Sequence, residues 1–146
     1  MKMEHSVIIN RPLKGVFEYL ADIEKQVEWR SGAVEAKKTS EGPLAVGSTG
    51  WEVLQFLGRK MEITFEVTDY QPDKLLAFRN TSGPMALRSR LTFEEVPGGT
   101  RVVFTIEGEP GGLFKLGGPI LCRIARRRIE ADCSNLKDLL EARGQG

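Results

Sequence analysis

Three polar side chains interrupt segments that are otherwise apolar, and their types suit ligand recognition. Gln55 shares a predicted strand face with Trp51, Ser89 lies two positions after Leu87, and Arg79 ends an apolar run. Burying a polar group costs roughly 2–7 kcal/mol unless it finds a partner. If these side chains point inward, a ligand carbonyl or carboxylate, or water, would satisfy them, with Arg79 as the anion anchor. The alternative is a different strand register, in which Arg79 faces water.

His5 is the only histidine, and it shares a predicted strand face with Val7 and Ile9. Facing a cavity, it could act as a general acid or base. No serine or cysteine nucleophile accompanies it in a recognisable motif, and a histidine this close to the N-terminus is usually exposed. His5 and Arg79 are therefore the candidates for catalysis, without a catalytic motif around either.

The two cysteines, Cys122 and Cys133, fall in one predicted helix, eleven residues apart. That separation is roughly 16 Å of helical rise, whereas a disulfide needs Cα atoms within about 7 Å. With a single histidine, a zinc site would also lack ligands. We expect two packing residues, with no metal and no cofactor.

Length and composition predict one domain, residues 1–146, large enough to bury a sizeable core. The net charge of +1 gives no reason to expect nucleic acid as a partner. No apolar run approaches the roughly 18 residues of a membrane span, and the N-terminus lacks the apolar core of a signal peptide. The predicted location is cytoplasmic.

About seven β-strands are predicted to position these candidate side chains. The clearest one, residues 60–68, alternates apolar residues such as Met61 and Phe65 with polar ones, as in an antiparallel sheet covered on one side. The others are predicted at residues 3–10, 33–39, 46–57, 75–80, 85–95 and 100–107.

Three helices complete the prediction. Pro12 suits the first turn of one short helix, and Asp22 is a suitable N-cap for a second that ends near Trp29. Residues 119–143 form a helix about 37 Å long. Strands followed by a terminal helix indicate an α+β fold with helices on one side of an antiparallel sheet.

Several segments resemble one known superfamily over nearly the whole chain. They are Ile9-Asn10-Arg11-Pro12, residues 16–22, Trp29, residues 80–84, 113–119 and 135–141. On these segments the chain resembles the START-like (SRPBCC, helix-grip) superfamily, and in particular its polyketide cyclase/dehydrase-like branch. The resemblance implies a curved antiparallel sheet and a long C-terminal helix that enclose a mainly apolar cavity. Its mouth would lie near the short helices and the start of the long one.

The expected lining combines aromatic residues that can stack on a ligand with adaptable methionines and a few polar groups. The predicted ligand-binding residues are Trp29, Trp51, Gln55, Met61, Phe65, Arg79, Met85, Leu87, Ser89, Phe114, Ile120 and Ile124. Ordinary core packing is the alternative, and in this fold core and cavity wall are the same surface.

Two further features are predicted near the start of the long helix. Arg123, Arg126 and Arg127 share one helix face and could contact anionic lipid headgroups or a partner protein. A solvated helix face is the alternative. Separately, the chain could form a homodimer. Residues 113–116 could form a flap hinged at Gly117 and Gly118, or these glycines merely turn the chain.

Three functions fit this sequence. The first is binding, with or without transport, of a small hydrophobic, aromatic or lipid-like ligand between sheet and helix. The second is a cyclase or aromatase-like enzyme that folds a reactive chain by shape, so whether the protein is an enzyme stays open. The third is an interaction module with a filled cavity. Cavity volume separates the third from the other two.

Overall fold

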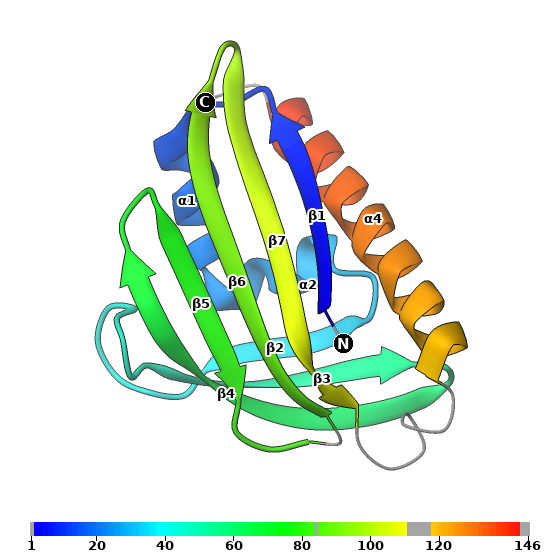
Figure 1. Cartoon of the computed structure of the whole chain (residues 1–146). Coiled ribbons are helices and arrows are strands. Elements are labelled where there is room, and N and C mark those ends of the chain that lie inside the picture. The colour runs from blue at the N-terminus through cyan, green and yellow to red at the C-terminus, as the bar shows by residue number, and fades with distance from the viewer. Residues whose placement is uncertain (1, 84, 111–117, 144–146) are drawn as a thin grey trace.

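A curled antiparallel sheet and a long C-terminal helix dominate the computed structural model, which describes residues 2–83, 85–110 and 118–143 (Figure 1). The helices are α1 (Leu13–Ala21), η1 (Ile23–Lys25), α2 (Gln26–Trp29) and α4 (Gly118–Ala142). The strands are β1 (Lys2–Ile9), β2 (Ala33–Lys38), β3 (Thr49–Phe56), β4 (Arg59–Gln71), β5 (Leu75–Asn80), β6 (Met85–Val96) and β7 (Gly99–Pro110). The predicted α+β helix-grip architecture is confirmed.

The seven strands form one sheet in the order β1-β7-β6-β5-β4-β3-β2, with every neighbouring pair antiparallel. Strands β2 to β7 are a meander in which each strand pairs with the next. β1 lies at the opposite edge from β2, so the short helices carry the chain from one edge of the sheet to the other (Figure 1). Asp22 caps η1, as predicted, by accepting a hydrogen bond from the Glu24 backbone N–H.

Most strand ends lie within one residue of the prediction, but the start of β3 and the ends of β4 and β7 differ by three residues. β3 begins at Thr49 and not at residue 46, because the preceding residues form a turn in which Gly47 has φ +93° and Ser48 Oγ accepts from the Ala45 N–H. β4 continues to Gln71, beyond the predicted end at residue 68, and its register against β5 shifts after Val67. The longer β4 carries the sheet's curvature past the predicted strand end.

The core lies between the inner face of the sheet and the helices. Ile9, Leu20, Leu76 and Leu136 are at most 1% exposed, and they come from β1, α1, β5 and α4. Residues so far apart in sequence meet only when both layers are formed. The C-terminal half of α4 therefore depends on the whole sheet for its packing.

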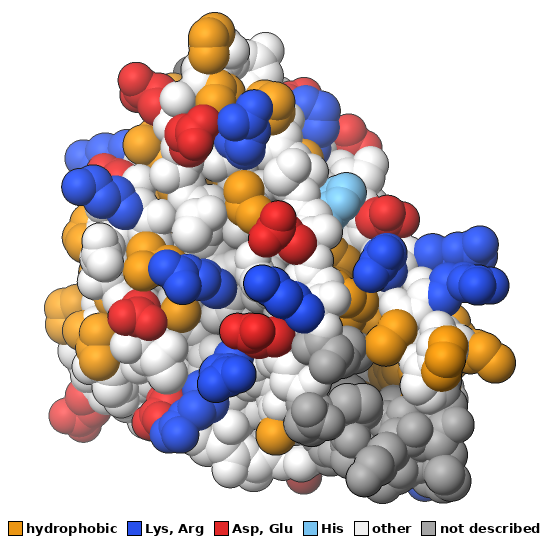
Figure 2. All heavy atoms as spheres, viewed as in Figure 1, with side chains coloured by type: hydrophobic (Ala, Val, Ile, Leu, Met, Phe, Trp, Pro, Cys, Tyr) orange, Lys and Arg blue, Asp and Glu red, His pale blue; other side chains and the backbone are white. Residues whose placement is uncertain are grey.

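The outer face of the sheet is polar. Figure 2 shows Lys and Arg interspersed with Asp and Glu over this face. Arg101 pairs with Glu94 at 3.0 Å, and Arg79 pairs with Glu66 across β4 and β5. Such exposed ion pairs each contribute only about 0–1 kcal/mol to stability, so the charges of the outer face serve mainly to keep that face hydrated.

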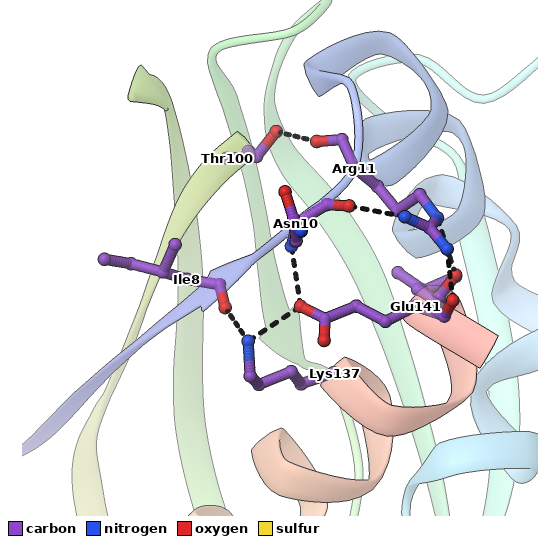
Figure 3. Close-up of polar contacts among 7 residues, drawn as sticks. Ile8, Asn10, Arg11, Thr100, Lys137 and Glu141 are labelled. Atoms are coloured by element: carbon purple, nitrogen blue, oxygen red, sulfur yellow. Dashed lines mark hydrogen bonds and ion pairs between the residues drawn. The ribbon is translucent and has the colours of Figure 1, made fainter. Parts of the chain in front are cut away.

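The C-terminal end of α4 is fastened to the end of β1 (Figure 3). Glu141 accepts hydrogen bonds from the Asn10 backbone N–H and from Lys137, each at 2.7 Å, and Lys137 also donates to the Ile8 carbonyl. The Arg11 guanidinium donates to the backbone carbonyls of Leu140 and Glu141. A cation at these orphan carbonyls stabilises the helix terminus.

These contacts also affect the Glu141 carboxyl group. The hydrogen bond from Lys137, followed by that from the Asn10 N–H, holds the pKa of Glu141 below its usual range. From this fixed end, α4 runs alongside β1 toward the end of β3 (Figure 1). The N-terminal half of the helix thereby faces the inner side of the sheet at a distance from the main core.

Candidate functional site

A cavity of about 260 Å³ lies between the inner face of the sheet and the N-terminal half of α4. The sheet side is mainly apolar and is formed by Leu54, Met61, Phe65, Phe78, Leu91 and Phe104. Met61 and Phe65 are four positions apart on β4, and they share a face because alternate side chains of a strand point to the same side. The predicted apolar face of β4 is therefore the cavity wall.

The helix side of the cavity follows the periodicity of α4. Leu121, Cys122, Ala125 and Ile129 line the cavity, spaced by one, three and four positions. The same stripe continues into Cys133 and the buried C-terminal half of the helix. One helix face thus covers the cavity in its first half and fills the core in its second.

Aromatic rings form much of the wall. The Trp29 ring lies 5.8 Å from that of Phe104, centroid to centroid. Phe65 and Phe78 meet edge to face, with centroids 5.6 Å apart and an interplanar angle of 86°. These rings offer both faces and edges to a flat apolar molecule.

A charged pair interrupts the apolar wall. Arg30, directly after α2, donates from Nη1 to Glu52 Oε2 at 2.8 Å and to Gln26 Oε1 at 2.8 Å. Glu52 lies on the inner face of β3 opposite Ile63, and its side chain is only 10% exposed. A carboxylate in that position would be costly without a partner. All three polar side chains line the cavity.

Two further polar side chains of α4 form hydrogen bonds beside the cavity, one to the turn before β2 and one to β3. Asp132 is buried and accepts a hydrogen bond from the Ser31 backbone N–H at 2.9 Å. Arg128 donates to the Gln55 carbonyl at 2.9 Å, with its guanidinium carbon 5.0 Å from the centre of the Phe56 ring. Gly32 permits this approach, since a Cβ there would lie 2.4 Å from Arg128 Nη1.

The two thiols have different surroundings. Both are free; Cys133 is buried and Cys122 is half-buried in the cavity wall. Burial, followed by the nearby Asp132 carboxylate, raises the pKa of Cys133 to about 12. Cys133 is therefore a protonated packing residue at neutral pH, as the sequence predicts.

Half of the predicted ligand-binding residues border the cavity. They are Trp29, Gln55, Met61, Phe65, Leu87 and Ser89. Gln55 is exposed, and its backbone carbonyl accepts the hydrogen bond from Arg128. Contact of these residues with a ligand stays a prediction.

Two predicted lining residues lie on the outer face instead. Trp51 is opposite Thr64 and does not line the cavity. Arg79 is exposed and pairs with Glu66, so it is not an inward-facing anion anchor. Position 51 faces outward because Gly50, its neighbour, must face the ring of Phe65 on the inner side.

On the long helix α4, the cavity-lining residues are one position further along the chain than predicted. Ile120 is 69% exposed, and Ile124 is half-buried without lining the cavity. The helical phase set by the buried C-terminal half turns Leu121 and Ala125 toward the cavity in their place. The side chain of Met85, and Phe114 altogether, lie outside the described residues, as does the proposed flap at residues 113–116.

His5 lies on the inner face of β1, as predicted, opposite Phe104 of β7. It is half-buried and does not line the cavity. β1 is an edge strand that packs against α4, so its inner face is covered by the helix. His5 is thus outside the cavity lining, and a catalytic role for it stays a prediction.

The predicted arginine cluster is exposed. Arg123, Arg126 and Arg127 make no hydrogen bond or ion pair with another described residue. Their contact with a lipid surface or a partner protein stays a prediction. Arg128 differs, because it reaches back to β3.

Sequence reasoning missed the charged pair and the helix stripe. Glu52 follows Gly50 by two positions, and that spacing was the available indication that the alternate residues Gly50, Glu52 and Leu54 of β3 face inward. The helix stripe could have been found from Leu140, Leu136 and Cys133, which are spaced by four and three positions. Continuing this spacing toward the start of the helix leads to Ile129 and Cys122. Arg30 gave no comparable indication, because it lies in a loop.

Two negative observations apply to the described part of the chain. Within it, no group of three or more His, Cys, Asp or Glu side chains is arranged to hold a metal ion. None of the helices in the described ranges combines the length and apolarity needed to cross a bilayer.

The fold and its cavity define a START-like helix-grip protein. The chain belongs to the family described as polyketide cyclase/dehydrase and lipid transport, whose profile matches residues 1–141. No curated protein matches the sequence.

Similar solved structures share this fold at low sequence identity. TTHA0849 of Thermus thermophilus is 16% identical with a TM-score of 0.86, over 99% of this chain and 100% of that one. The Zhui aromatase/cyclase of Streptomyces sp. R1128 is 17% identical with a TM-score of 0.84, over 100% and 96%. A START superfamily protein of Mycobacterium smegmatis is 12% identical with a TM-score of 0.82, over 97% of each chain. At these identities the likeness shows the fold alone.

Proposed function

We propose that the chain binds a small, mainly apolar ligand in the cavity between the sheet and α4. The observation that supports this most directly is the cavity itself, about 260 Å³ in volume, with aromatic and aliphatic walls. Burying apolar surface there contributes roughly 25 cal/mol per Å², before the entropy costs of association. A preformed apolar cavity with a few polar groups is the usual form of a small-molecule site.

The volume limits the size of the ligand. Ligand pockets commonly measure about 300–1,000 Å³, and this cavity lies just below that range. A compact molecule such as a fused two-ring aromatic compound suits it better than a long lipid chain. The walls formed by Trp29 and Phe78 would then stack on, or meet the edge of, the ligand rings.

A cavity-filling variant tests this proposal. Ala125 lines the cavity, so the side chain in Ala125→Phe would occupy the ligand volume. Ile120→Phe is the matched control, because it adds the same side chain to the same helix at an exposed position. We expect naphthalene to bind the wild type and Ile120→Phe with equal Kd in calorimetric titration, and Ala125→Phe at least tenfold more weakly. Equal affinity for all three proteins would contradict the proposed location.

An enzyme of the cyclase or aromatase type is the second candidate, and the Arg30–Glu52 pair in the cavity wall favours it. The inward cluster of Arg79, Gln55 and His5 that would have favoured catalysis does not form. A direct test adds a synthetic poly-β-ketone and follows aromatic absorbance. A rate equal to that in buffer would remove this candidate.

The third candidate, an interaction module, assumed a filled cavity. The open volume beside α4 favours a ligand over this candidate. Docking through Arg123, Arg126 and Arg127 would be additional to ligand binding and would not replace it.

A further inference from the structure

The hydrogen-bonding capacity of the Arg30–Glu52 pair is only partly used. Nη1 of Arg30 donates to Glu52 Oε2 and Gln26 Oε1, which uses both of its hydrogens. Among the described residues, Nη2 and Nε of Arg30 and Oε1 of Glu52 have no hydrogen-bond partner. An arginine has five N–H donors and a carboxylate has two acceptor oxygens, so donors and an acceptor remain side by side.

These unused atoms reach open space. In the described part of the chain, no side-chain nitrogen or oxygen of a non-exposed residue is both fully buried and without a partner. Glu52 has an exposed fraction of only 8%, and both residues line the cavity. The cavity is therefore the space in which Glu52 Oε1 can find a partner, and Arg30 lies beside it.

The charges around this position balance. Arg30 and Glu52 neutralise each other, and Arg128 and Asp132, which also line the cavity, add one charge of each sign. The fifth charged residue of the lining, Arg90, is exposed, and its alternation with the cavity-lining Ser89 and Leu91 turns its side chain to the outer face. A ligand carboxylate would meet two carboxylates, and an ammonium group would meet two guanidinium groups. Neither charge sign is favoured. A hydroxyl group is uncharged and both donates and accepts, so it fits a neighbouring donor and acceptor.

We propose that the Arg30–Glu52 pair is a polar subsite that selects uncharged ligands carrying a hydroxyl group, such as a phenol or an enol. The ligand hydroxyl donates to Glu52 Oε1 and accepts from Arg30. This inference rests on the proposed function, because it assumes that the apolar body of the ligand occupies the cavity. Hydrogen bonds to charged groups discriminate against an analogue that lacks the hydroxyl group.

The probes are 2-naphthol and naphthalene, which differ only in the hydroxyl group. Calorimetric titration at neutral pH gives the ratio of their Kd values for each protein. For the wild type we expect 2-naphthol to bind about tenfold more tightly, as one charge-assisted hydrogen bond would give. 2-Naphthoate, which carries a carboxylate in place of the hydroxyl, is expected to bind more weakly than 2-naphthol.

A double variant removes the subsite. Arg30→Leu combined with Glu52→Leu replaces both charges by apolar groups, a change that buried ion pairs often tolerate. The matched control combines Glu66→Leu with Arg79→Leu, which removes an Arg–Glu pair from the outer face of the same sheet. We expect the 2-naphthol preference to fall to about one in the cavity variant and to stay unchanged in the control.

The outcomes separate this inference from the proposed function. If both the wild type and the cavity variant bind naphthalene and show the same preference for 2-naphthol, the subsite is overturned and the proposed function is left intact. Tighter binding of 2-naphthoate than of 2-naphthol to the wild type would also overturn it. Binding of neither naphthalene nor 2-naphthol to the wild type would overturn both proposals. If the double variant does not fold, Glu52→Gln substitutes for it, with a lower 2-naphthol preference and tighter 2-naphthoate binding expected; unchanged values would again overturn the subsite.

Discussion

Gly50 on β3 lies opposite Phe65 on β4, and the Phe65 ring occupies the position that a Cβ at residue 50 would take. The nearest ring atom would be 2.3 Å from that Cβ. Glycine is thus the residue that leaves room for the ring on the inner face. By alternation, this contact turns Glu52 toward the cavity and Trp51 away from it.

Gly50→Ala should both destabilise the protein and weaken ligand binding. The added methyl group would push the Phe65 ring toward Phe78 and into the cavity, and overpacking of this kind costs about 1–3 kcal/mol. Chemical denaturation gives the loss in unfolding free energy, and naphthalene titration gives the loss in affinity. Val46→Ile is the control, because it adds one methyl group at a position that is 63% exposed and does not line the cavity. Unchanged stability and affinity in Gly50→Ala would contradict the packing described.

Arg128 is expected to hold the N-terminal half of α4 against β3. Arg128→Met removes the hydrogen bond to the Gln55 carbonyl and the contact with the Phe56 ring, and should lower the unfolding free energy by about 1–2 kcal/mol. Amide hydrogen exchange in the first half of α4 should become faster. Arg127→Met, an exposed neighbour, should change neither quantity. Equal exchange rates in the two variants would remove this role for Arg128.

The two cysteines should differ in reactivity. Burial keeps the Cys133 thiol protonated, with a pKa raised to about 12, and out of contact with reagent. A disulfide reagent should therefore modify Cys122 alone in the native protein at neutral pH, and both thiols after unfolding. Because Cys122 lines the cavity, saturating 2-naphthol should slow its modification. Modification of Cys122 at the same rate with and without a bound probe would place the probe elsewhere.

The stabilising effect of the Glu141 charge should depend on pH. Its pKa is lowered from 4.5 in the folded state by the hydrogen bonds from Lys137 and Asn10. A carboxyl group whose pKa is lower in the folded than in the unfolded state stabilises the folded protein. This stabilisation is complete at pH values above the unfolded-state pKa and is lost as the pH falls through the folded-state pKa. Glu141→Gln should therefore lower Tm at pH 7, with the difference shrinking below pH 4.5. A Tm difference that is the same at about pH 7 and about pH 3 would exclude the charge as its cause.

The sequence was sufficient for the fold where its patterns were unambiguous. Residues 60–68 alternate apolar and polar side chains without exception, so the inner face of β4 followed directly. Asp22 and Pro12 indicated the helix starts through local chemistry that needs no tertiary contact. These features are encoded over a few neighbouring residues.

The cavity lining was harder because it depends on contacts between distant segments. In β3, Trp51 and Val53 look like the inner face, yet the Phe65 ring and the Arg30 guanidinium decide which side faces inward. A local pattern contains neither partner. At the start of α4, apolar residues occur on adjacent positions, and the choice between Ile120 and Leu121 is made by packing further along the helix.

Mapping a bound probe onto the chain is the measurement that tests the cavity most directly. Backbone and methyl resonances would be followed by NMR while naphthalene is added to the wild type. We predict shifts concentrated at Leu54, Leu87, Leu91, Phe104 and Ala125, which line the cavity from both layers, with little change at Trp51 and Arg79 on the outer face. Shifts concentrated on the outer face, or no shifts at saturating naphthalene, would contradict the account.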